Sequence, residues 1–136
     1  MVEVNFVYQG ALRCECTHAP SSSKLITDAP ADNYGKGEAF SPTDLVGTAL
    51  ISCIITTMAI VAERKGIKLD GSKGKVIKEM STSAPRRISK LTCNIEIPLP
   101  ATHPSRASLE AAAHACPVHK SLHPETQIQI DFNWIG

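Results

Sequence analysis

Aromatic residues are scarce in this chain of 136 residues, which contains three Phe, two Tyr and one Trp. The chain also lacks an excess of positive or negative charge, because its 14 Lys and Arg residues are matched by 13 Asp and Glu residues. A surface that binds nucleic acid needs a basic patch with aromatic side chains on which bases stack. The short basic segment from Arg86 to Lys90 does not meet that requirement. We therefore expect no nucleic-acid partner.

The beginning of the chain lacks the pattern of a secretory signal. Met1–Phe6 contains no basic segment leading into an apolar one, and a signal peptide needs both. The five cysteines are odd in number and irregular in spacing, unlike those of a secreted disulfide scaffold. We expect a cytoplasmic protein with reduced thiols.

A long apolar run extends from Leu45 to Ala62 without a charged residue. Its length is at the lower limit for crossing a bilayer. The run contains a glycine and several hydroxyl side chains and is flanked on both sides by strand-like sequence. Helices that are apolar on all sides also occur in the cores of soluble proteins. We expect a buried central helix and no membrane partner.

The boundaries of this helix are marked by its flanking residues. Ser41 is a candidate N-cap, Pro42 suits the first helical position, and Asp44 completes a pattern similar to a capping box. Gly66 is a typical C-terminal stop. The sequence predicts a helix that ends at Lys65.

Alternating apolar residues and turn signals predict the other elements. Strands are expected at Val2–Tyr8, Ala11–Thr17, Lys24–Asp28, Ile67–Met80, Ile88–Leu99 and Gln127–Trp134, and helices at Pro104–Ala115 and from Pro117 to about Leu122. No repeat or linker divides the chain, so we expect a single domain over residues 1–136. The order predicts an α+β fold with mostly antiparallel strands.

Two cysteines stand in settings that could support chemistry. Cys53 lies inside the apolar helix, where a thiol is usually inert. The neighbours on its face are small, apolar or hydroxyl-bearing: Val46, Ala49, Thr56, Thr57 and Ile60. Cys116 precedes Pro117 and would be the N-cap of a short helix, whose free N–H groups stabilise a thiolate. This local argument favours Cys116 as the more acidic thiol, and a plain core or cap role stays open for both.

A metal site is the main alternative to thiol chemistry. Two groups of potential ligands occur: Cys14, Cys16 and His18, and His114, Cys116 and His119. Neither has the spacing of a structural zinc site, and ligands on alternate residues of one strand form a poor tetrahedron. We expect no metal and no cofactor, and we expect Cys93 to be a core residue.

Two segments together resemble one family of thiol peroxidases. Phe40–Cys53 resembles the N-P-E-x-L…A-A-C-F helix of the OsmC/Ohr family, the osmotically inducible protein C and organic hydroperoxide resistance proteins, and has its spacing from Pro42 to Cys53. Ala113–Val118 resembles its second motif, A-x-x-C-P-V. The order of the predicted elements agrees with the family over nearly the full length.

The resemblance implies an OsmC-like intertwined homodimer in which antiparallel β-sheets wrap around long central helices. It also implies reduction of hydroperoxides by a cysteine pair. Cys53 would be the peroxidatic thiol and Cys116 the resolving thiol, whose disulfide a dithiol reductant reopens. The apolar face of Cys53 favours organic hydroperoxides. The resemblance and the local argument disagree about which thiol reacts first, and we follow the resemblance.

The chain departs from the family at two points. Thr43 stands where the family has its active Glu, and the family's catalytic Arg cannot be aligned with certainty. A peroxidatic thiolate needs a nearby cation. The candidates, in order of preference and from either chain of a dimer, are Arg87, Arg86, Arg13 and Lys36. Without such a cation, the alternative is a non-catalytic OsmC-like protein that binds a small molecule.

Overall fold

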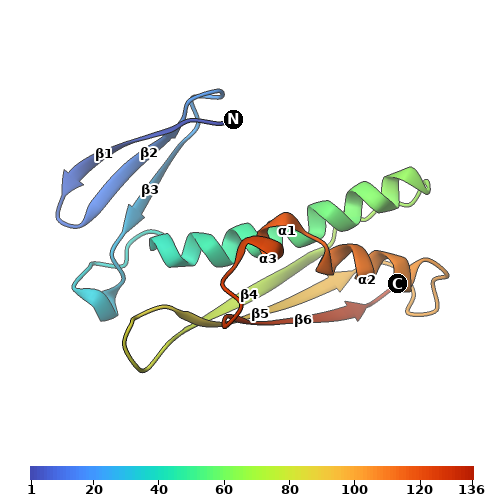
Figure 1. Cartoon of the computed structure of the whole chain (residues 1–136). Helices are drawn as coiled ribbons and strands as arrows, with labels where there is room; N and C mark the ends of the chain where they lie inside the picture. Colours follow the sequence, from blue (N-terminus) through green and yellow to red (C-terminus); the bar gives the residue numbers. More distant parts are fainter. The chain divides into compact units, whose positions relative to one another are not determined.

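The computed structural model describes all residues from 1 to 136, which form two three-stranded β-sheets and a long helix (Figure 1). The predicted α+β fold with a long helix is therefore confirmed. The chain consists of two compact units, Met1–Val46 and Gly47–Gly136. That these units act as a single domain stays a prediction.

The first unit contains an antiparallel sheet in the order β1-β2-β3. Its strands are β1 (Val4–Gly10), β2 (Arg13–His18) and β3 (Lys24–Asp28), followed by a short 3-10 helix, η1 (Ala31–Asn33). All three strands lie within two residues of the predicted bounds. The pairing of β2 with β3 places Arg13 opposite Asp28.

The long helix α1 (Pro42–Arg64) begins and ends where its flanking residues predict. The backbone N–H of Ser41 donates to Asp44 Oδ2 at 2.9 Å, and the N–H of Asp44 donates to Ser41 Oγ at 3.1 Å. This reciprocal pair is a capping box. At the other end Gly66 has a φ of +70°, the left-handed conformation in which helices commonly stop.

The second unit contains a sheet in the order β4-β5-β6. Its strands are β4 (Lys73–Met80), β5 (Ile88–Ile97) and β6 (Gln127–Trp134). Helices α2 (Arg106–His114) and α3 (Pro117–Ser121) connect β5 to β6. Since this connection crosses over the sheet, β5 and β6 are parallel, while β4 and β5 are antiparallel.

The sequence predicts that β4 begins at Ile67, and this prediction is wrong, because β4 begins at Lys73. Residues 67–72 form a turn in which the N–H of Ser72 donates to the carbonyl of Leu69 at 3.0 Å. Gly71 has a φ of +85°, a conformation that glycine adopts without strain. Leu69 is buried by this turn, so its apolar character reflects the core and not a strand.

The core of the second unit lies where α1, α2 and α3 cover one face of the β4-β5-β6 sheet (Figure 1). Leu50, Ile54, Met58 and Ala62 are all fully buried and recur at every fourth residue of α1, which places them on one face of the helix. Cys93 is fully buried on β5, so its predicted core position is confirmed.

The opposite face of α1 is not covered by the chain itself. By length and composition α1 could cross a membrane, and 28% of its most apolar stretch is buried inside the protein. Ile60, for example, is 49% exposed. One chain therefore buries only part of this helix.

Candidate functional site

The second unit brings Cys53 and Cys116 together, although they come from different elements. Cys53 lies in the middle of α1, and Cys116 lies at the junction of α2 and α3. The two thiols lie close enough for each to shift the pKa of the other. A third group, Thr57 Oγ1, lies 3.9 Å from the same sulfur. The site is therefore a pair of interacting thiols, both in the free state.

Cys116 is the N-cap of α3, as its position before Pro117 predicts. Its sulfur accepts a hydrogen bond from the backbone N–H of His119 at 3.2 Å. The residue has the extended backbone conformation that N-caps adopt, and its side chain is fully buried. Cys53 is only half buried, so the two thiols differ in their access to solvent.

The surroundings of the two thiols shift their pKa values in opposite directions. Burial raises the pKa of Cys53, but hydrogen bonds from the Val118 N–H, the Cys116 thiol and Thr57 outweigh it and lower the pKa. Burial likewise raises the pKa of Cys116; the His119 N–H lowers it, and the hydrogen bond to Cys53 and the charge of Cys53 raise it further. Cys53 is therefore the more acidic thiol.

The local argument that Cys116 is the more acidic thiol is wrong. It assumed that the free N–H groups of α3 act on the N-cap residue alone. In the structure the Val118 N–H acts on both thiols and lowers the pKa of each. Sequence reasoning missed Val118, although Pro117 indicated that unpaired N–H groups follow it.

A third thiol, Cys93, lies in the same core as Cys116. Burial, together with the nearby charge of Cys116, raises the pKa of Cys93 to about 11. Because the thiolate is the nucleophile, this side chain is inert near neutral pH.

We expect iodoacetamide at about pH 8 to label Cys53 and to leave Cys93 unlabelled, because only the thiolate reacts. Peptide mass spectrometry of the folded protein, with fully unfolded protein as the reference for complete labelling, measures both sites. If Cys93 were labelled as fast as Cys53, Cys93 would not be the inert thiol that its raised pKa predicts.

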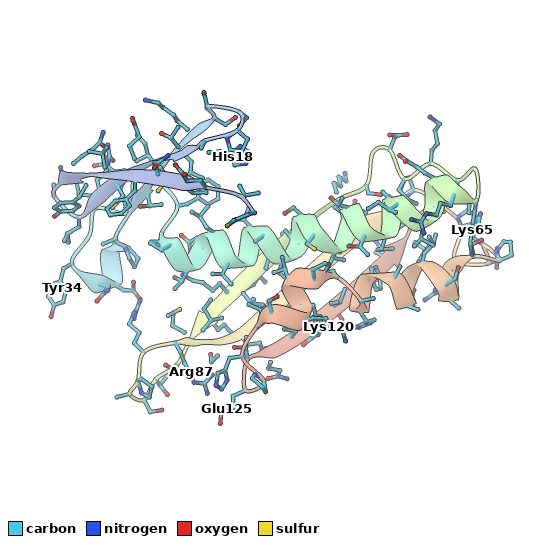
Figure 2. All side chains as sticks on the ribbon, turned by 45° about the horizontal axis from the view of Figure 1, so that its top comes forward. His18, Tyr34, Lys65, Arg87, Lys120 and Glu125 are labelled. Atoms are coloured by element: carbon cyan, nitrogen blue, oxygen red, sulfur yellow. The ribbon has the colours of Figure 1, made fainter.

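No Lys or Arg is among the groups that shift the pKa of Cys53. Arg87, the first candidate from the sequence, forms an ion pair with Glu125 at 3.3 Å and donates to the carbonyl of Ile88. Figure 2 shows Arg87 and Glu125 side by side near the β4–β5 connection. Arg86 is exposed in that connection and Lys36 is exposed in the loop before α1.

Arg13 in the first unit has a different environment. Its Nε and Nη2 donate to the two carboxylate oxygens of Asp28 at 2.7 and 2.9 Å, and Nη2 lies 3.4 Å from Glu38. Sequence reasoning named Arg13 but missed Asp28 and Glu38. The pairing of β2 with β3 is the feature that brings Asp28 to Arg13.

The potential metal ligands do not converge. No group of three or more His, Cys, Asp or Glu side chains is arranged to hold a metal ion. Cys14, Cys16 and His18 lie along one strand, and His18 Nδ1 forms a hydrogen bond with Ser21 Oγ at 2.6 Å. His114 and His119 are in edge-to-face contact near Cys116, with ring centroids 6.2 Å apart.

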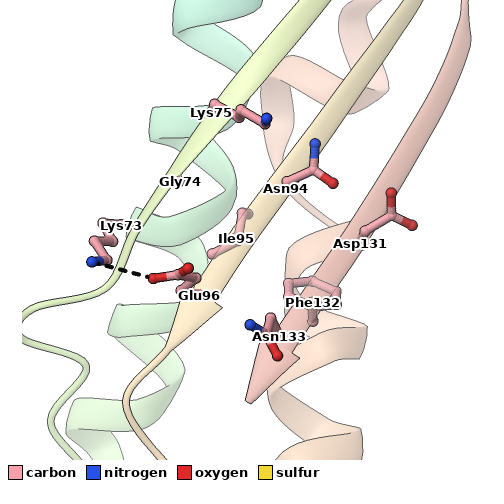
Figure 3. A pocket seen from close by; sticks show the side chains of 9 residues that line it. All are labelled: Lys73, Gly74, Lys75, Asn94, Ile95, Glu96, Asp131, Phe132 and Asn133. Atoms are coloured by element: carbon pink, nitrogen blue, oxygen red, sulfur yellow. Dashed lines mark ion pairs between the residues drawn. The ribbon is translucent and has the colours of Figure 1, made fainter. Parts of the chain in front are cut away.

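A hollow of about 570 Å³ on the β4-β5-β6 sheet is lined by no cysteine (Figure 3). Its lining residues include Lys73, Lys75, Asn94, Glu96 and Asp131. Lys73 and Glu96 form an ion pair across it at 3.5 Å. Opposite charges on adjacent strands are an ordinary feature of an exposed sheet face, so we do not assign this hollow to the thiol site.

Comparisons with known proteins identify the family of this chain and its fold. The sequence profile of the family described as OsmC-like protein matches residues 35–131, which include both Cys53 and Cys116. A comparison with curated proteins gives no match.

Among solved structures, one from Psychrobacter arcticus 273-4 is 38% identical, with a TM-score of 0.91 over 98% of this chain and 96% of that chain. It is provisionally described as an osmotic stress induced and detoxification response protein. An organic hydroperoxide resistance protein OsmC from Legionella pneumophila is 16% identical, with a TM-score of 0.77 over 98% of this chain and 96% of that chain. An organic hydroperoxide resistance protein from Elizabethkingia anophelis is 12% identical, with a TM-score of 0.79 over 99% of this chain and 96% of that chain.

Proposed function

Because this chain belongs to the OsmC-like protein family, we propose that it reduces organic hydroperoxides through Cys53 and Cys116. The observation that carries this proposal is the proximity of the two thiols, which shift each other's pKa, together with the lowered pKa of Cys53. A peroxidatic thiol has to ionise and a resolving thiol has to reach it. Solved organic hydroperoxide resistance proteins with the same fold also support the proposal.

The proposed cycle has three balanced steps. The Cys53 thiolate attacks one peroxide oxygen of ROOH, the O–O bond breaks, and the alcohol ROH leaves after taking up a proton. The resulting sulfenic acid of Cys53 is attacked by the Cys116 sulfur, which releases water and forms a disulfide. A dithiol then reduces this disulfide by exchange and is itself oxidised to a disulfide, which restores both thiols.

The substrate class follows from the surroundings of Cys53. The side chains near it on α1 are apolar or carry a hydroxyl group, and none of them is charged. An apolar site favours a hydroperoxide with an organic substituent over hydrogen peroxide. Purified protein with cumene hydroperoxide and a dithiol tests this directly, and absence of peroxide consumption by the wild type would refute the proposed function.

Among the candidate cations, we propose Arg13 from a second copy of the chain as the one that assists Cys53. Arg87 forms an ion pair with Glu125 and donates a hydrogen bond to the carbonyl of Ile88. Arg13 is held by Asp28 in the first unit, and a second copy of the chain could supply it.

A non-catalytic protein that binds a small molecule at the same thiols is the second candidate. It is favoured by the absence of any Lys or Arg among the groups that shift the pKa of Cys53. Thr43 in place of the family's Glu agrees with it. The measured pKa of Cys53, discussed below, distinguishes the two candidates.

We further propose that the working form is a homodimer. One face of α1 is exposed, and Phe6 and Tyr8 project from one face of β1 with 71% and 56% exposure. Exposed apolar faces of this extent mark interaction surfaces. An intertwined dimer would bury them in an obligate interface of more than roughly 2,000 Å². The protein is proposed to act in the cytoplasm, with no nucleic-acid or membrane partner.

Sedimentation equilibrium at micromolar concentration is expected to give the mass of a dimer. Ile60→Lys is expected to yield monomer or unfolded protein, because a charge would then face the covered side of α1. Ser83→Lys in the exposed β4–β5 connection is the matched control and should remain dimeric. A folded wild-type monomer would exclude this assembly.

A further inference from the structure

The two thiols of the site differ in how they can be reached. Cys116 is fully buried, and its sulfur accepts a hydrogen bond from the backbone N–H of His119 at 3.2 Å. Cys53 is only half buried, with Thr57 Oγ1 3.9 Å from its sulfur. A second copy of the chain can add cover but cannot remove any, so Cys116 is closed to solvent in a dimer as well. A reagent from solvent therefore meets the sulfur of Cys53 and not that of Cys116.

This difference bears on the step that restores the two thiols. A thiolate can attack either sulfur of a disulfide, and the sulfur that is not attacked leaves as a thiolate. The two properties that select the attacked sulfur point in opposite directions in this protein. The pKa of Cys53 is lowered, which makes Cys53 the better leaving group and favours attack on Cys116. Access to solvent favours attack on Cys53.

Access is the stronger of these two properties. A leaving group with a higher pKa slows the exchange, but the exchange still proceeds. An attacking thiolate, in contrast, has to approach its target sulfur in the right direction, which a fully buried atom such as Cys116 Sγ does not allow. If Cys53 reacts with a hydroperoxide, the working form has a route from solvent to its sulfur, and a thiol can use that route.

We propose that the dithiol reductant attacks the sulfur of Cys53, so that peroxide and reductant reach the site by one route and Cys116 stays covered throughout. This inference rests on the proposed function and assigns each sulfur its part in the reduction. The reductant thiolate bonds to Cys53 as the S–S bond breaks, and Cys116 leaves with the electron pair and takes up a proton. The second thiol of the reductant then attacks the reductant sulfur of the mixed disulfide, which releases the Cys53 thiolate and oxidises the reductant to a disulfide.

The surroundings of Cys116 suit a leaving group in this step. In the resting protein burial raises the pKa of Cys116, the His119 N–H lowers it, and two effects of Cys53 raise it further. In the mixed disulfide Cys53 carries neither a proton nor a charge, so those two effects are absent. The His119 N–H stays next to the sulfur, and a hydrogen bond to a thiolate stabilises it. Cys116 is therefore a better leaving group at this stage than its resting pKa suggests.

The test locates the mixed disulfide in wild-type protein whose Cys53–Cys116 disulfide has been formed with diamide, which requires no peroxidase activity. A limiting amount of the monothiol 2-mercaptoethanol is added, and acid stops the exchange by protonating the thiolates. Peptide mass spectrometry then shows which cysteine carries the added thiol. We expect it on Cys53 in the folded protein. If the oxidised protein is first unfolded in urea, both sulfurs are accessible and both should carry it.

Two substitutions at Thr57 give a kinetic readout of the same step in diamide-oxidised protein. Thr57→Leu adds bulk beside Cys53 and should slow reduction by dithiothreitol roughly tenfold to 100-fold, since a displacement of about 1 Å can cost about 100-fold. Thr57→Val keeps the size, removes only the hydroxyl group and should be reduced at the wild-type rate. Ala115→Leu adds bulk at an exposed position next to Cys116 and should also leave the rate unchanged.

A mixed disulfide on Cys116 of the folded protein would overturn the inference. Slower reduction of Ala115→Leu, with Thr57→Leu unchanged, would do the same. The mass-spectrometric mapping uses the wild type, so it gives an answer even if a Thr57 variant does not fold. Consumption of cumene hydroperoxide is measured separately, and a wild type that lacks it refutes the proposed function whichever sulfur carries the added thiol.

Discussion

Replacing Cys53 with Ser should abolish dithiol-dependent peroxide reduction, with a loss of roughly 10⁴-fold or more, because the attacking nucleophile is removed. Cys116→Ser should behave differently. Its Cys53 can still attack one equivalent of peroxide but has no thiol partner with which to form the disulfide. Stoichiometric peroxide should leave that variant one oxygen atom heavier at Cys53, as mass spectrometry can show.

The wild-type chain should instead form an intramolecular Cys53–Cys116 disulfide under the same conditions. The two thiols are close enough to shift each other's pKa, so only a small movement is required, and a disulfide needs Cα atoms within about 7 Å. Cys93→Ala is the matched control and should still form this disulfide, since Cys93 is inert. Stable sulfenic acid without a crosslink in the wild type would contradict the resolving role of Cys116.

The second large effect is expected for Arg13→Ala. It should raise the pKa of Cys53 and reduce kcat/KM by roughly 10² to 10³-fold, the usual cost of removing one oriented donor to a developing oxyanion. Both changes have the same cause, because the variant removes a donor and leaves the negative charge of Asp28 uncompensated. Arg87→Ala removes a guanidinium from the β4–β5 connection, where it pairs with Glu125, and should change neither quantity if Arg13 is the assisting cation.

The pKa of Cys53 from pH-dependent alkylation also decides between the two candidate functions. A value below about 7 supports the peroxidase, whereas one at or above the free-thiol value of about 8.5 supports the binding protein. Since hydrogen bonds lower this pKa, peroxide reduction should increase with pH through the pKa and then level off as the thiolate fraction saturates. If no arginine variant changes both the pKa and the rate, a cation does not activate this thiol.

Elements with local signals could be predicted from the sequence. The bounds of α1 follow from Ser41, Asp44 and Gly66, whose interactions involve only neighbouring residues. The strand β6 follows from the alternation of Ile128, Ile130, Phe132 and Trp134, since side chains of a strand point to opposite faces in turn. The two cysteine motifs likewise indicated the family before any geometry was known.

Other properties of the site depend on contacts between segments that are distant in sequence. The lowered pKa of Cys53 comes from Val118 and Cys116, which reach it only because α3 packs against α1. The orientation of Arg13 comes from Asp28, which only the pairing of β2 with β3 identifies. The sequence determined which two cysteines are the candidates for the site, because their motifs are local. Tertiary structure decided which thiol is acidic and which carboxylate holds the arginine, because hydrogen bonds that shift a pKa or fix a side chain depend on distances in space.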